Sequence, residues 1–263
     1  MKYGCCTNMA NYELLEKLGY DYIELAGNSI SQMSEEEFAK VKETIQNGKV
    51  KCCGFNAALT PDVAIVGEDY DLEKARDYAR KLCKRGSELG ISAIGIGSPK
   101  SRHFKEGDNL ETAWQQAKDF VEMFAQEAEP YGLTVMWESL NHTESQFGLR
   151  IREGADLAKE LGRSNVKIVF DIYHMYMEQE EMEELLYSLP YVNHVHIAER
   201  VGEERRYPSA ALRPYYKELL RPVVRSGYQG AISTEAFDGD VAEGAQRSIE
   251  LLKGIVEELE KEC

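Results

Sequence analysis

The sequence lacks the features of membrane, secreted and nucleic-acid-binding proteins. Its 263 residues contain no run approaching the roughly 18 consecutive apolar residues of a membrane span. No apolar stretch follows Met1–Cys6, so we expect no targeting segment. Basic residues are few, 31 against 46 acidic ones, and the formal charge of −15 opposes binding to nucleic acid. The six cysteines show no CxxC spacing, so we expect reduced thiols and a cytoplasmic location.

The chain also lacks an internal linker. No Pro-, Gly- or Ser-rich tract divides it, and prolines number only 7. Hydrophobic residues make up 43% of the sequence, enough for a sizeable core. Because an α/β barrel of about 250 residues is one domain, we predict a single domain over residues 1–263.

Eight short apolar segments are typical of buried parallel strands, since they lack strict alternation with polar residues. They are Lys2–Cys6, Tyr22–Leu25, Lys51–Phe55, Ala93–Ile96, Thr134–Trp137, Lys167–Phe170, His194–Ile197 and Ala231–Thr234.

Amphipathic segments with apolar residues three and four apart lie between these strands and predict helices. They are Asn11–Leu18, a helix from Ser34 through Ile45, Asp71–Leu89, Asn109–Tyr131, Gly148–Leu161, Gln179–Leu189, Arg213–Val224 and Asp240–Glu260. Ser34 and Glu37 have capping-box spacing, and Gly19 and Gly90 are placed to end helices. Eight successive βα units predict an α/β fold, a single (β/α)8 TIM barrel.

Metal-binding side chains stand at the ends of the last four predicted strands. Glu138, Asp171 and Glu235 each directly follow an apolar strand, and His194 and His196 lie on the seventh. The catalytic end of such a barrel is formed by the carboxyl ends of its strands. A buried charge there is costly unless it is paired or bound to metal, so the pattern predicts a metal site. The two histidines face the same side of their strand, and only one need be a ligand.

Three oxygen donors and one nitrogen favour one Mn²⁺, Mg²⁺ or Co²⁺ ion over structural zinc, with Mn²⁺ preferred and catalytic zinc left open.

At these residues the chain resembles the xylose isomerase-like TIM barrel superfamily and its sugar isomerase/epimerase group. Within the group it is most similar to the ketose (D-tagatose and D-psicose) 3-epimerases. The resemblance rests on four segments, Glu138–Glu144, Asp171–Met175, His194–Glu199 and Glu235–Phe237.

The resemblance implies a ligand set of Glu138, Asp171, His196 and Glu235, with Glu138 and Glu235 as the catalytic, proton-transferring pair. It also implies substrate contacts from Glu144 and His174. The family has an arginine six residues beyond the ligand histidine, where this chain has Gly202. We expect Arg200, Arg205 or Arg206 to replace it, and we assign substrate binding to Arg200 and Arg205.

The chemistry expected of such a site begins with one proton abstraction next to a ketose carbonyl, through an enediolate. Return of the proton to the other face of the same carbon is epimerisation, return to the neighbouring carbon is aldose–ketose isomerisation, and loss of a β-hydroxyl is dehydration. The ligand set does not choose among these three. We expect a small-molecule, non-phosphorylated sugar, because the loop after the eighth strand carries Asp238, Asp240 and Glu243. A sugar-phosphate isomerase remains an alternative.

Two other functions are compatible with a barrel, and a homo-oligomer is compatible with the sequence. An endonuclease IV-like hydrolase needs several zinc ions, yet only 5 histidines occur and the charge opposes DNA. A non-catalytic binding module would not need two proton-transferring carboxylates.

Two further features have both a functional and a structural interpretation. Gly95 and Gly97 begin a segment in which we expect a turn with Arg102 or His103 over the pocket, rather than a phosphate-binding loop. Aromatic residues could line the sugar site or pack in the core, and for Trp137 we expect core packing; they are Trp114, Trp137, Phe55, Phe147 and Phe237.

Overall fold

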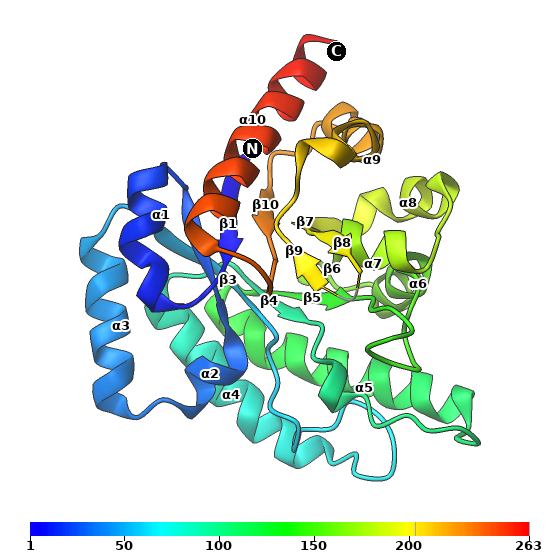
Figure 1. Cartoon of the computed structure of the whole chain (residues 1–263). Helices are drawn as coiled ribbons and strands as arrows, with labels where there is room; N and C mark the ends of the chain where they lie inside the picture. Colours follow the sequence, from blue (N-terminus) through cyan, green and yellow to red (C-terminus); the bar gives the residue numbers. More distant parts are fainter. Residues whose placement is uncertain (203, 263) are drawn as a thin grey trace.

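The structure, a computed structural model, describes residues 1–202 and 204–262. Parallel strands close into a barrel in the order β1-β10-β7-β6-β5-β4-β3-β2, and helices surround it (Figure 1). The predicted (β/α)8 barrel is therefore confirmed. The barrel strands are β1 (Lys2–Cys6), β2 (Tyr22–Ala26), β3 (Lys51–Asn56), β4 (Ala93–Ile96), β5 (Thr134–Glu138), β6 (Val166–Asp171), β7 (Val192–Ile197) and β10 (Ala231–Thr234).

The helices occupy the predicted segments, with two short additions, α2 and α7, directly after strands β2 and β6. They are α1 (Tyr12–Leu18), α2 (Gly27–Gln32), α3 (Glu35–Asn47), α4 (Leu72–Leu89), α5 (Leu110–Ala128), α6 (Ile151–Leu161), α7 (Ile172–Met177), α8 (Met182–Ser188), α9 (Arg213–Arg225) and α10 (Val241–Lys261). Short 3₁₀ turns cover Met9–Asn11, Pro99–Ser101, Glu129–Tyr131, Leu189–Tyr191 and Ala210–Leu212.

Local sequence signals fix several helix ends. The Ser34 hydroxyl accepts from the Glu37 amide, and the Glu37 carboxylate accepts from the Ser34 amide, which forms the predicted capping box. Gly19 and Gly90 end α1 and α4 with φ of 74° and 76°, a left-handed conformation that glycine adopts without a steric penalty.

The loop after β7 contains a hairpin that the sequence pattern did not indicate. Strands β8 (Glu199–Val201) and β9 (Glu204–Arg206) pair antiparallel, with Arg200 opposite Arg205. Arg206 also forms a bridge with Asp238, in the loop after β10. The hairpin is thereby held against the carboxyl end of the barrel.

A polar layer fills the barrel interior just behind that end. The Tyr22 hydroxyl hydrogen-bonds to Ser233 Oγ at 2.8 Å, and His194 Nε2 lies 2.9 Å from the same oxygen. Gly4 leaves room for the tyrosine ring, since a Cβ there would lie 2.0 Å from Tyr22 Cε2. Side chains therefore close the barrel behind its carboxyl end.

None of the helices in the described part of the chain is long and apolar enough to cross a membrane. The described cysteines are free thiols, as expected, and Cys263 lies outside the described residues. They are Cys5, Cys6, Cys52, Cys53 and Cys83.

Candidate active site

The four predicted metal ligands meet at the carboxyl end of the barrel. Glu138 and Asp171 end β5 and β6, His196 lies near the end of β7, and Glu235 directly follows β10. All four side chains are buried, and one ligand atom from each lies within 4.8 Å of the others. The register of β6 and β7 brings two of the ligands side by side, because Asp171 is the β-sheet partner of His196.

Two small features hold the glutamates in place. A Cβ at Gly97 would lie 2.2 Å from Glu138 Oε2, so this glycine leaves the space that the carboxylate fills. Asn56, at the end of β3, donates from Nδ2 to Glu235 Oε1 at 2.6 Å. Gly97, directly after β4, therefore leaves room for Glu138.

The environments of the two glutamates move their pKa values in opposite directions. Burial raises the pKa of Glu138 to about 7, although His196 opposes the shift. Burial also acts to raise the pKa of Glu235, but His196 and Arg205 outweigh it and the net pKa is lowered. Such a divergent pair suits one group accepting a proton while the other supplies one.

The β8–β9 hairpin delivers Arg205 to the cluster. Its Nη2 lies 2.6 Å from Asp171 Oδ2 and 2.5 Å from Glu235 Oε2, and its Nε donates to the Glu235 carbonyl at 2.8 Å. The guanidinium is buried and packs over the rings of Tyr173 and Phe237. Arg205, one of the three candidate arginines in this loop, therefore contacts the four-ligand group directly.

Glu144 and His174, for which the resemblance implies substrate contacts, lie beside Arg205. Arg205 Nη1 is 3.4 Å from His174 Nε2 and 3.9 Å from Glu144 Oε1. Asn141 joins the two, lying 3.0 Å from Glu144 Oε1 and 2.9 Å from His174 Nδ1. Asn141, Glu144 and His174 therefore lie together with Arg205 on one flank of the four-ligand group.

Arg200 is not brought to this group. It is exposed on β8, and its contacts include the Gly202 carbonyl at 2.9 Å and Met177 Sδ at 3.4 Å. Arg206 is also exposed and pairs with Glu204. Substrate binding by Arg200 stays a prediction.

The expectation of Arg102 or His103 over the pocket is wrong. Arg102 is buried against the Trp137 ring, 4.2 Å from its centroid, and donates to the backbone carbonyls of Phe147 and Glu138. His103 contacts Asp69 and two loop carbonyls instead. Arg102 therefore supports the loop that follows Glu138 from behind.

Of the aromatic residues considered for a sugar wall, most belong to the core. Trp137 is fully buried and packs with Trp114 and Phe147, and Phe55 is also buried. Phe237 is different, because 68% of its surface is exposed at the mouth of the barrel.

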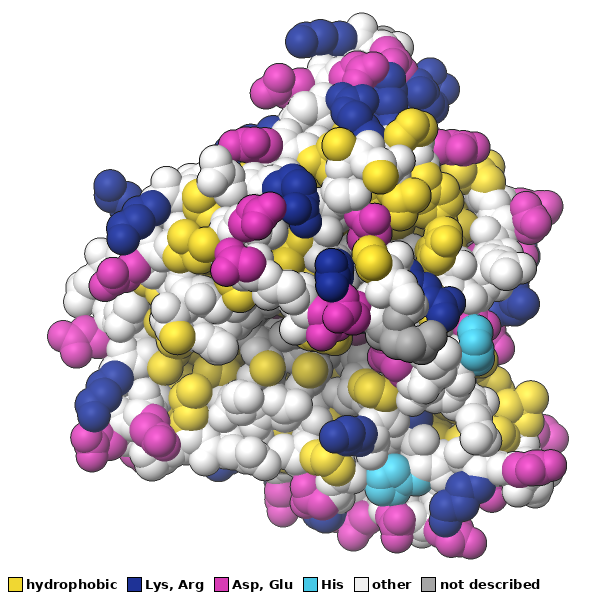
Figure 2. Space-filling view, in the orientation of Figure 1, with side chains coloured by type: hydrophobic (Ala, Val, Ile, Leu, Met, Phe, Trp, Pro, Cys, Tyr) yellow, Lys and Arg dark blue, Asp and Glu magenta, His cyan; other side chains and the backbone are white. Residues whose placement is uncertain are grey.

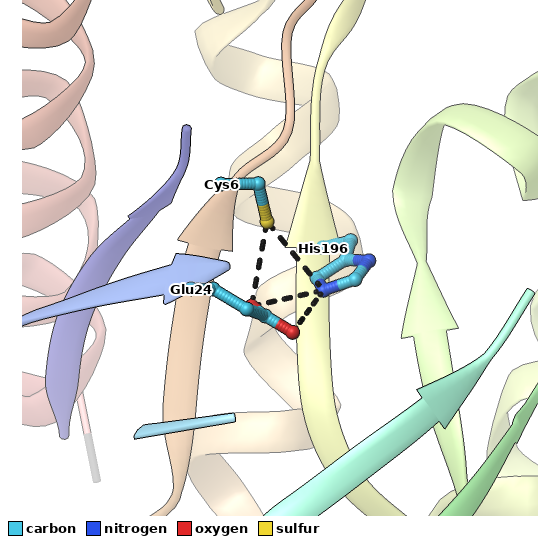
Figure 3. Close-up of side chains that lie close together, drawn as sticks. All are labelled: Cys6, Glu24 and His196. Carbon is cyan, nitrogen blue, oxygen red and sulfur yellow. Dashed lines mark hydrogen bonds and ion pairs between the residues drawn. The ribbon is translucent and has the colours of Figure 1, made fainter. Parts of the chain in front are cut away.

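A second buried group on the other side of His196 escaped sequence reasoning. Cys6, Glu24 and His196 converge from β1, β2 and β7 (Figure 3). His196 Nε2 lies 3.2 Å from Glu24 Oε2 and 3.9 Å from Cys6 Sγ, while its Nδ1 lies 2.8 Å from Glu138 Oε1. His194 Nε2 also reaches Glu24 Oε2, at 2.9 Å. His194 therefore supports Glu24 and lies outside the four-ligand group.

The donor set fits a divalent cation. Three buried carboxylates, balanced by one arginine and one imidazole, form an electronegative group that suits a hard or borderline ion. His196 presents Nδ1 to this group and Nε2 to Glu24, an arrangement in which a carboxylate orients a ligand histidine. Glu138, Asp171, His196 and Glu235 would hold the ion.

The chain is similar to known sugar epimerases. A family model described as xylose isomerase-like TIM barrel matches residues 12–255. D-psicose 3-epimerase of Agrobacterium fabrum is 25% identical over 230 residues, covering 86% of this chain and 78% of that one. The 3-dehydro-D-guloside 4-epimerase of Escherichia coli is 21% identical over 234 residues, covering 86% of each chain. A crystal structure of D-psicose 3-epimerase in the presence of D-fructose has the same fold, with a TM-score of 0.80 and 19% identity, covering 97% of this chain and 99% of that one.

Proposed function

The chain belongs to the xylose isomerase-like TIM barrel family, and from this we propose that it is a divalent-metal-dependent epimerase or isomerase of small keto-sugars. One observation carries the proposal: Glu138, Asp171, His196 and Glu235 present their ligand atoms within 4.8 Å of one another in a buried group. The names of the relatives support the substrate class. Psicose 3-epimerisation and 3-dehydroguloside 4-epimerisation both invert a carbon next to a ketone carbonyl.

In the proposed reaction, Glu138 and Glu235 exchange protons with the substrate carbon next to the carbonyl. One carboxylate removes the proton, and the electrons of the broken C–H bond form the C=C bond of an enediolate. The other, as a carboxylic acid, returns a proton to the opposite face of the same carbon. When bound, a divalent ion supplies a Lewis acid that stabilises negative charge on the substrate oxygens.

Substrate hydroxyls would be held on the flank formed by Glu144, His174 and Arg205. Arg205 offers donors and Glu144 accepts, which suits vicinal hydroxyl groups on a sugar. Arg200, exposed on the same hairpin, remains assigned to substrate binding as part of this proposal.

We favour Mn²⁺ as the ion, because the group combines three carboxylates with one imidazole. Reloading of metal-free protein separately with Mn²⁺, Mg²⁺, Co²⁺ or Zn²⁺, followed by elemental analysis and activity measurement, tests this preference. One bound ion per chain is expected. Three per chain would instead support the endonuclease IV-like alternative.

A non-phosphorylated sugar and a cytoplasmic location complete the proposal. Arg205 is already engaged by Asp171 and Glu235, so it offers little free positive charge to a phosphate. Free cysteines are typical of a reducing compartment.

The test is a screen of free ketoses and their phosphates with the metal-loaded protein in D₂O. We expect deuterium on the carbon next to the carbonyl, and product analysis separates epimer, aldose and dehydrated product. An absence of exchange with every keto-sugar would overturn the proposal. Strict dependence on a phosphate would make the protein a sugar-phosphate isomerase.

A further inference from the structure

A cavity of about 610 Å³ opens beside the four-ligand group, and neither Glu144 nor His174 lines it. It lies between the loop after β1, helix α2 and the loop after β10, and Figure 2 shows this face hollowed there with hydrophobic side chains exposed. A cavity of this size accommodates a drug-sized ligand, which is larger than one sugar ring.

The cavity adjoins the candidate active site. Cys6 and Asn56 line it, and they contact His196 and Glu235 at 3.9 Å and 2.6 Å. Ala236, which directly follows Glu235, also lines it. The cavity therefore lies next to the place where the proposed function puts the carbonyl of a keto-sugar.

The described lining of the cavity is uncharged and mostly apolar. No charged side chain lines it among the described residues, although charged residues make up 29% of the sequence. Most of the lining is apolar and includes Leu25, Ile30, Met33 and Val41.

Several polar groups of the lining are already paired within the protein. Asn11 Nδ2 donates to Thr7 Oγ1 at 2.7 Å, Asn8 accepts from a backbone amide, and Asn56 donates to Glu235. These pairings reduce the number of lining groups that could replace the hydration of a hydroxyl-rich or anionic group, whereas an apolar group would gain from burial.

Phe237 adds a second argument for an apolar occupant. It lines this cavity and is 68% exposed, and an aromatic ring so placed can cover a flat apolar ligand. Its other neighbour is the Arg205 guanidinium, 5.1 Å from the ring centroid. Phe237 therefore stands between the sugar flank and the apolar cavity.

We propose that the substrate is a keto-sugar carrying an uncharged apolar substituent, such as the aglycone of a keto-glycoside, and that this cavity binds the substituent. The proposal rests on the proposed function, because the keto-sugar part is assigned to the four-ligand group. It narrows the substrate class from free monosaccharides to substituted ones and excludes a phosphorylated or carboxylated extension.

The test compares methyl and 4-nitrophenyl 3-oxo-β-D-glucopyranoside, which share the keto-sugar and differ in the apolar group. Titration calorimetry on the Mn²⁺-loaded protein should give a Kd for the aryl compound lower by on the order of tenfold or more. Ala26→Leu, which adds bulk to the cavity wall, should bring the ratio of the two Kd values close to one. Ala211→Leu, on an exposed turn outside the cavity, should leave the ratio unchanged.

Equal Kd values in the wild-type protein, no measurable binding of either compound, or an unchanged ratio in Ala26→Leu would each overturn the proposal. Deuterium exchange of the same two compounds in D₂O reports on the proposed function separately. If the protein bound the aryl compound more tightly but exchanged no proton on any keto-sugar, the proposed function would be refuted and the proposed apolar site would stand. Exchange with equal Kd values would refute the apolar site alone.

Discussion

Replacing Glu24 by glutamine tests how the ligand histidine is oriented. Glu24 is fully buried, and its carboxylate accepts from donors on several sides. They are Ser233 Oγ at 2.6 Å, His194 Nε2 at 2.9 Å, His196 Nε2 at 3.2 Å and Cys6 Sγ at 3.4 Å. Glutamine keeps the shape but turns one acceptor oxygen into an NH₂ group. At least one donor then faces another donor.

The contacts of Glu24 allow the size of two effects of Glu24→Gln to be estimated, one on stability and one on metal affinity. A buried donor without a partner costs about 1–3 kcal/mol, so the free energy of unfolding of the metal-free protein should fall by about that amount. His196 Nδ1 faces the carboxylates only while Nε2 points to Glu24, and loss of such an orienting partner typically weakens metal binding by about 10–100-fold.

Both effects are measurable without turnover. Urea unfolding gives the stability, competition with a chelator gives the Mn²⁺ affinity, and ¹H–¹⁵N NMR of the His196 ring reports its protonation pattern. Glu43→Gln, at an exposed helix position, is the matched control and should change none of these. If Glu24→Gln binds Mn²⁺ within twofold of the wild-type affinity, Glu24 does not orient His196 and the reasoning is refuted.

Three further substitutions probe other parts of the structure. Gly97→Ala should lower Mn²⁺ affinity at least about tenfold, because its Cβ would lie 2.2 Å from Glu138 Oε2; unchanged affinity by chelator competition would contradict that role. Arg205→Gln should lower kcat/KM about 10–100-fold through lost charge-assisted hydrogen bonds, and steady-state kinetics showing wild-type values would remove Arg205 from the site. Burial raises the pKa of Glu180 from 4.5 to about 7 in the folded protein. The folded state therefore binds the Glu180 proton more tightly than the unfolded state does. The stability that this proton contributes is lost as the pH rises from about 4.5 through about 7. Glu180→Gln should therefore be more stable than wild type by about 1 kcal/mol at pH 8, after allowance for solvent screening, with the difference vanishing near pH 4 in urea titrations.

The fold and the four-ligand group could be predicted because both follow from local sequence patterns. Each strand is a short apolar run, and the barrel places every strand's carboxyl end on one face. Glu138, Asp171 and Glu235 stand out there as charges that directly follow apolar segments.

Other parts of the site depend on contacts between distant segments. Glu24 and Cys6 reach His196 only because β1 and β2 close the barrel against β10 and β7. Arg205 enters the cluster through a short hairpin of charged residues, which carries no hydrophobic periodicity to reveal it. One available signal was the glutamate inside the apolar run Tyr22–Ala26, a buried charge as conspicuous as those at the later strand ends.

The central claim is that Glu138 and Glu235 move a proton next to a keto-sugar carbonyl. Its most direct test is solvent-deuterium incorporation by Mn²⁺-loaded wild type, Glu138→Gln and Glu235→Gln, followed by NMR on one keto-sugar. The metal content of each variant is measured in the same samples. The account predicts exchange by the wild type and a loss of at least about a hundredfold in each metal-loaded variant. Near-normal exchange in both variants with metal bound would contradict it.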